Sequence, residues 1–145
     1  MNELNRSYLN ELKGEHKTVG QVLEEIKGFV AANNIQGIAG RMGLLKNGLV
    51  AHIKKEDGKM YTDLLKTAKD MNIEMVSVTV NTFSTAMKGI ADRVLKFFGK
   101  YPDKDAIAKN TAEFNKDFHG VYEDIMKRVN NEEKVLYPMY EKHCC

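Results

Sequence analysis

The sequence predicts an all-α protein that folds as an antiparallel, up-down four-helix bundle. Apolar residues recur at steps of three and four positions through four long stretches, which is the period of a helix with one buried face. The 145 residues include only 2 prolines and 11 glycines, so few positions interrupt these stretches. Turn-forming residues separate them, and long helices joined by short turns pack as an antiparallel bundle.

The apolar pattern gives the approximate bounds of each helix. The four helices are predicted over Ser7 to Ala32, Ile38 to Met71, Ile73 to Gly99 and Asp105 to Lys142. Ser7 is a residue type that caps helices. The segment MVSVTV is rich in β-branched residues, but a lone strand would have no partner, so it is predicted to be helical. Glycines at positions 37, 40 and 43 either allow the first helix to approach closely or mark a later start of the second helix.

Length and charge restrict the class of protein. A chain of 145 residues is expected to form one domain over residues 1–145. Its 22 basic and 20 acidic side chains alternate without a basic block, which argues against a nucleic-acid partner. No apolar run reaches the roughly 18 residues that cross a bilayer, and the polar N-terminus is not a signal peptide, so a cytoplasmic protein without a membrane partner is expected. A protein partner or a homodimer is left open.

The second half of the chain repeats the first, over about 7–71 and 73–142. The spacing of His16, Val19, Leu23 and Ile26 is the spacing of Met87, Ile90, Val94 and Phe97. In the same way, Leu49, His52, Ile53, Glu56 and Met60 match Ile125, Arg128, Val129, Glu132 and Leu136. Each half therefore consists of a plain helix followed by a helix with a polar pair four residues apart.

Five polar side chains are predicted to point into the apolar core, namely His16, His52, Glu56, Arg128 and Glu132. A buried carboxylate must be paired or bound to metal. A histidine and a glutamate at i and i+4 lie on one face of a helix and can reach a common ion. Imidazole with carboxylate suits iron, manganese or zinc. The alternatives are a buried His52–Glu56 hydrogen bond without metal and an ion pair between Arg128 and Glu132.

Three segments in order resemble the hemerythrin-like family of cation-binding domains. They are GEHKTVGQVLEEI, which looks like the first histidine helix, HIKKED, which looks like its HxxxE helix, and NNEEKVLYPMY, which looks like the end of the second HxxxE helix. The resemblance implies a hemerythrin-like bundle with a non-haem di-iron centre, held by histidines from both halves and two bridging glutamates. The matching residues are His16, His52, Glu56 and Glu132.

Two positions depart from the family pattern. Met87 and Arg128 stand where the resemblance implies histidines, and both fall in the second half. We expect Met87 to be core packing and the Arg128 guanidinium to replace one ion, holding Glu132 and Glu56 by charge-assisted hydrogen bonds or stabilising a bound anion. The other four residues would then bind a single iron.

The function expected from this resemblance is a non-haem iron protein that handles a small ligand such as dioxygen, nitric oxide or peroxide. Two other classes stay open. One is a metal-free interaction or sensory module of the same fold. The other is an iron-dependent oxidase or an enzyme that repairs iron centres.

Several further residues have the right chemistry but less suitable positions. His119 and Glu123 also fit HxxxE but are expected to be exposed; a rotated helix would make His119 a ligand. Tyr61 and Tyr137 match between the halves and are expected near the edges of their stripes, capping the end of the bundle and hydrogen-bonding a neighbouring helix.

The C-terminus ends in His143, Cys144 and Cys145. Adjacent cysteines seldom form a relaxed disulfide with each other, so an exposed, reduced tail is expected. A redox or metal-capturing tail is the alternative.

Overall fold

The structure is a computed structural model that describes residues 2–145, and within this range it contains helices and turns but no strand. The all-helical fold class is therefore confirmed. The elements in order are α1 (Glu3–Ala31), α2 (Ile35–Lys55), η1 (Glu56–Met60), α3 (Tyr61–Asp70), α4 (Glu74–Lys100), α5 (Lys104–Lys109), α6 (Thr111–Asn131), η2 (Glu132–Leu136) and α7 (Tyr137–Cys144). The segments η1 and η2 are π-helical turns of five residues each.

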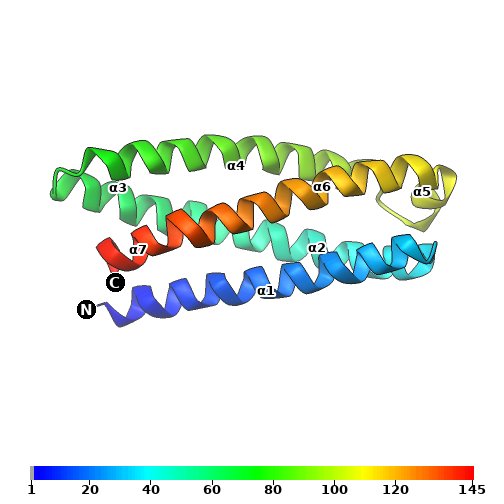
Figure 1. The fold of residues 1–145 in the computed structure, drawn as a ribbon, viewed down its shortest axis with the longest axis horizontal. Helices are drawn as coiled ribbons and strands as arrows, with labels where there is room; N and C mark the ends of the chain where they lie inside the picture. The colour runs from blue at the N-terminus through cyan, green and yellow to red at the C-terminus, as the bar shows by residue number, and fades with distance from the viewer. Residues whose placement is uncertain (1) are drawn as a thin grey trace.

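The elements form four long rods. The helices α1 and α4 are each one rod, whereas α2, η1 and α3 follow one another without a break, as do α6, η2 and α7. Figure 1 shows the rods side by side along their length, with both termini at one end and α5 at the other. This arrangement brings the middles of all four rods together.

Side-chain caps explain where the first two helices begin. Asn2 accepts a hydrogen bond from the Asn5 amide at 3.0 Å and caps α1, so the prediction of a Ser7 cap is wrong. Asn34 caps α2 by accepting from the Gly37 amide at 2.9 Å. A Cβ atom at Gly37 would lie 2.8 Å from the Phe29 ring, so this glycine is what lets the end of α1 approach α2.

The last predicted helix, Asp105 to Lys142, is not continuous. Asn110 has an extended backbone (φ −150°, ψ 83°) that ends α5, and its side chain accepts from the Glu113 amide at 3.1 Å to start α6. The apolar period continues across this break, which is why periodicity alone missed it. The MVSVTV segment lies inside α4 and is helical as predicted.

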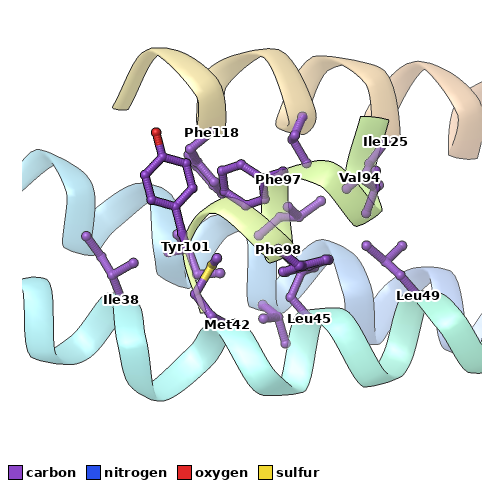
Figure 2. Close-up of a cluster of buried hydrophobic side chains, with 14 of the residues drawn as sticks. Ile38, Met42, Leu45, Leu49, Val94, Phe97, Phe98, Tyr101, Phe118 and Ile125 are labelled. Atoms are coloured by element: carbon purple, nitrogen blue, oxygen red, sulfur yellow. The ribbon is translucent and has the colours of Figure 1, made fainter. Parts of the chain in front are cut away.

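Two apolar clusters fill the core on either side of a polar centre. The cluster near α5 includes Phe97, Phe98 and Phe118, which Figure 2 shows in close-up. The cluster near the termini includes Leu12, Met60, Val80 and Leu136. Each rod contributes a residue to the level between the two clusters, and in chain order these residues are His16, His52, Met87 and Arg128. The apolar clusters thus hold the polar residues at one level of the molecule.

Within residues 2–145, no helix combines the length and the apolar composition that crossing a bilayer requires.

Candidate metal centre

Four of the residues predicted from sequence come together in the middle of the core. His16, His52, Glu56 and Glu132 each offer one ligand atom, and these four atoms all lie within 4.8 Å of one another. All four side chains are buried, and Glu56 has no exposed surface. The helix α1 supplies His16, the last turn of α2 supplies His52, and the two glutamates begin the two π-helical turns.

The donor atoms are spaced as ligands of one ion would be. His16 Nε2 lies 2.8 Å from Glu132 Oε1, and His52 Nε2 lies 2.8 Å from Glu56 Oε1. His52 Nε2 is 3.6 Å from Glu132 Oε1. Atoms bound to one ion at about 2.0–2.2 Å are about 3 Å apart, so the three distances fit a shared cation.

The outer nitrogen of each histidine is held by a carboxylate. His52 Nδ1 donates to Glu15 Oε1 at 2.8 Å, and His16 Nδ1 donates to Glu133 Oε1 at 3.1 Å. With a cation at the centre, the proton on Nδ1 would leave the lone pair of Nε2 free to bind it. The Nε2 atoms of both imidazoles point toward the centre.

The carboxylate of Glu56 lacks a partner. Both of its oxygens are fully buried, and neither accepts a hydrogen bond from a residue that the structure describes. The nearby His52 Nε2 is close enough but is not aligned to donate. Because an unpaired buried carboxylate is costly, a cation at this point is the group that fits it.

Electrostatics point to the same position. Burial and the nearby Glu132 carboxylate raise the pKa of Glu56, although His52 acts against them. Burial works to raise the pKa of Glu132 too, yet hydrogen bonds from His16 and His52 and the charge of Arg128 hold it well below its usual range. Burial alone would lower the pKa of His52, but the carboxylates of Glu132 and Glu56 raise it to about 10. The two carboxylates thus favour a positive charge between them.

Arg128 lies beside the centre and is buried. Its Nε donates to Glu132 Oε2 at 3.1 Å, and its Nη2 donates to Tyr61 Oη at 2.8 Å. Its guanidinium stacks over the Phe83 ring at 4.5 Å, a favourable cation–π contact. Of the two glutamates, only Glu132 accepts a hydrogen bond from this arginine; the expected bond to Glu56 is not formed.

The tyrosines do not cap the end of the bundle. Tyr61 and Tyr137 are buried, and both hydroxyls reach the polar centre. In a regular helix the fifth residue after a glutamate points about 140° away from it. A π-helical turn, with its i→i+5 hydrogen bond, places that residue back on the glutamate's face.

A small cavity adjoins the centre. Its volume is about 30 Å³, and its lining includes the four candidate ligands and Arg128. The rest of the lining is apolar, with Val19, Leu49, Ile53, Met87, Ile90, Val94, Ile125 and Val129. A cavity of about 10–15 Å³ already admits one water molecule, so this space is large enough for a diatomic molecule.

Other residues with ligand chemistry lie elsewhere. The side chains of His119 and Glu123 are 76% and 66% exposed, as predicted, and neither belongs to the buried group of candidate ligands. The expectation of an exposed tail is wrong: Cys144 and Cys145 are half-buried against the cluster near the termini, and Cys144 O accepts from Asn5 Nδ2 at 2.8 Å. Burial raises the pKa of the Cys144 thiol, which keeps it protonated.

Sequence reasoning missed Glu15 and Glu133. Each stands next to a predicted core residue, His16 or Glu132, and is therefore turned about 100° around its helix, toward the neighbouring rod. A glutamate directly next to a polar residue of the core could have predicted these two partners.

The comparisons with known proteins agree with this geometry. The sequence model described as the Hemerythrin HHE cation binding domain matches residues 7–140. Comparisons with curated proteins and with solved structures gave no match. A match over this much of the chain, together with a buried group of histidines and glutamates, shows that the chain belongs to the hemerythrin family of HHE cation-binding domains.

Proposed function

We propose that this protein binds one non-haem iron per chain and uses it to take up a small ligand such as dioxygen, nitric oxide or peroxide. The observation that carries the proposal is the unpartnered carboxylate of Glu56, which faces the Nε2 atoms of two oriented histidines. His16, His52, Glu56 and Glu132 would hold the ion. Two imidazoles with two carboxylates suit a divalent first-row metal, and iron is the choice that the family favours.

The second half-site would hold a guanidinium in place of a second ion. Arg128 already donates to Glu132, and Met87, at the position that matches His16, offers only a thioether. A buried positive charge beside the centre disfavours another cation. We therefore expect one ion per chain.

The surrounding side chains support a role with small ligands. Iron with an open coordination position supplies reversible binding or redox chemistry of such molecules. The cavity is narrow and mostly apolar, so it admits a diatomic molecule and excludes bulk water. The Arg128 guanidinium at its wall would orient Glu132 and stabilise an anionic ligand.

The proposal includes a single domain with an antiparallel, up-down four-helix arrangement of two helix pairs. Support comes from the four rods in Figure 1 and from the π-helical turns, which occur at matching positions of the two halves. In such bundles, metals lie in the core between facing helices.

The first test is the iron content per chain after anaerobic incubation with ferrous iron and removal of excess. We expect one iron in the native protein and a loss of at least tenfold in affinity in the variant His52→Ala/Glu56→Ala. The matched control is His119→Ala/Glu123→Ala, which removes the same spacing from an exposed surface and should keep one iron.

The outcomes separate the functional classes. Full iron content in the His52→Ala/Glu56→Ala variant would contradict the proposed site. A native protein without iron, whose melting temperature does not change with iron, would favour the metal-free interaction module, because an ion bound only to the folded state must stabilise it. Dioxygen consumption in the presence of a reductant would identify an oxidase rather than a carrier.

A further inference from the structure

The hydroxyl group of Tyr137 lies among the donor atoms of the candidate centre. Its Oη is 3.0 Å from His16 Nε2, 3.3 Å from His52 Nε2 and 3.3 Å from Glu132 Oε1. The ring is buried and stacks on the His16 ring, with centroids 5.0 Å apart and an angle of 17° between planes. The hydroxyl is thus fixed in place by packing as well as by its polar contacts.

These three distances match those between the other donor atoms. Three of the separations between a histidine nitrogen and a glutamate oxygen are 2.8, 2.8 and 3.6 Å, and all four atoms lie within 4.8 Å of one another. Ligands of one ion, bound at about 2.0–2.2 Å, are about 3 Å apart. The oxygen of Tyr137 therefore lies at the spacing expected of one more ligand of the same ion.

A neutral hydroxyl does not satisfy this position. It has one hydrogen and can donate to one acceptor at a time. When each imidazole carries its single proton on Nδ1, facing Glu133 or Glu15, the hydroxyl has three acceptors around it: His16 Nε2, His52 Nε2 and Glu132 Oε1. At least two of the three contacts would then join lone pairs. A cation bound by all four atoms removes this conflict.

The repeat offers an internal comparison. Tyr61 follows Glu56, and Tyr137 follows Glu132, by five positions at the end of a π-helical turn. Tyr61 Oη accepts from the positive guanidinium of Arg128, which also donates to Glu132 Oε2. The matching phenol of the other half-site faces the other oxygen of Glu132 and the position of the proposed ion. Tyr61 thus faces the guanidinium of Arg128, and Tyr137 faces the position of the proposed ion.

We propose that Tyr137 is a fifth ligand of the ion, bound to ferric iron as a phenolate. On binding, the phenolic O–H bond breaks, an iron–oxygen bond forms, and the proton leaves to the solvent. Phenolate oxygens ligate ferric iron in other proteins, including haem proteins with an axial tyrosine. The inference rests on the proposed iron site and adds a residue that none of the motifs assigns.

The test compares spectra and iron content of the same samples. Full-length protein is loaded anaerobically with ferrous iron, freed of excess, oxidised with one equivalent of ferricyanide and desalted. We expect a visible charge-transfer band from phenolate to ferric iron in the native protein, with tyrosine ring modes in resonance Raman spectra excited in that band. Tyr137→Phe should lose the band while retaining iron. Tyr61→Phe should keep the band, because its hydroxyl is bound to Arg128.

Two further measurements test the ligand role without relying on Tyr137→Phe alone. Ring-deuterated tyrosine should shift the Raman modes of the native protein, which identifies a phenolate even where Tyr137→Phe folds poorly. Tyr101→Phe, which alters a hydroxyl bound to Asp117 outside the centre, is the control and should leave the spectrum unchanged.

Each outcome decides the matter. Iron in the native protein without the band, or a band that survives in iron-loaded Tyr137→Phe or disappears in Tyr61→Phe, would overturn the ligand role and leave the iron site standing. The absence of bound iron in the native protein would overturn the site and the ligand role together.

Discussion

At the residue scale, the polar side chains of the core differ in how their charges are balanced. Glu132 has Arg128 and His16 as partners, whereas neither oxygen of Glu56 accepts a hydrogen bond from a residue that the structure describes. Removing one partner of a buried charged group destabilises the folded protein. A substitution of any of these side chains therefore affects the residues that it contacts. Outside this group, Glu15 and Glu133 fix the imidazoles from the half-exposed side.

Glu15→Gln tests the role of these outer carboxylates. Glu15 Oε1 accepts from His52 Nδ1 at 2.8 Å, and a neutral amide would orient and polarise the imidazole less strongly. Loss of such a partner typically lowers metal affinity about 10–100-fold, and this range is the expected result in an iron titration. Glu11→Gln is the matched control: Glu11 lies one turn earlier on α1 and pairs with Lys55 rather than with a histidine. Equal affinities of the two variants would exclude an orienting role.

The sequence sufficed for the four candidate ligands because they lie on regular helical turns. A rotation of about 100° per residue places His16, His52, Glu56 and Glu132 on inner faces, and the structure brings them together. The sequence placed Tyr137 at the end of the bundle, but its hydroxyl lies at the centre. It follows a π-helical turn, and the extra residue of such a turn cannot be recognised from composition or from the apolar period.

At the scale of elements, the π-helical turns decide what faces the centre. Each begins at a glutamate of the centre and ends just before a tyrosine. Such turns insert one residue into a helix and often occur at functional sites. The break at Asn110 is easier to recognise in the sequence than the π-helical turns are. An asparagine three residues before a glutamate is a pattern typical of a helix N-terminus.

Tyr8→Phe tests what holds the first π-helical turn open. Tyr8 Oη donates to Lys55 O at 2.5 Å and accepts from the Met60 amide at 3.1 Å, so one hydroxyl bridges the two ends of the turn. Its loss leaves both backbone groups without this partner. We expect a decrease of about 1–2 kcal/mol in the free energy of unfolding, measured with urea.

The control for this change is Tyr122→Phe, which removes a surface hydroxyl bound to Glu24. A surface change of this kind should alter stability by less than about 0.5 kcal/mol. If Tyr8→Phe is as stable as the control, Lys55 and Met60 close the turn on their own, and the hydroxyl has no structural role.

At the scale of the whole molecule, the two helix pairs place different residues at the polar centre. In the first pair, His16 and His52 direct Nε2 toward the middle and bind Glu133 and Glu15 through Nδ1. In the second, Met87 and Arg128 occupy the matching positions and line the same cavity. The second pair thus places the positive charge of the Arg128 guanidinium beside Glu132. This asymmetry was readable from the sequence because both departures fall at one level of the repeat.

The double variant Met87→His/Arg128→His tests whether these two residues alone limit the protein to one ion. It places imidazoles at the two positions that match His16 and His52, and it frees Glu132 Oε2 from the guanidinium. We expect the iron content to rise from one to two per chain. Arg128→Met, which removes the charge without adding a ligand, should stay at one iron, as should Met87→His, in which the guanidinium still repels a second cation. One iron in the double variant would mean that the second helix pair no longer holds its side chains in metal-binding positions, and that the repeat survives in the backbone only.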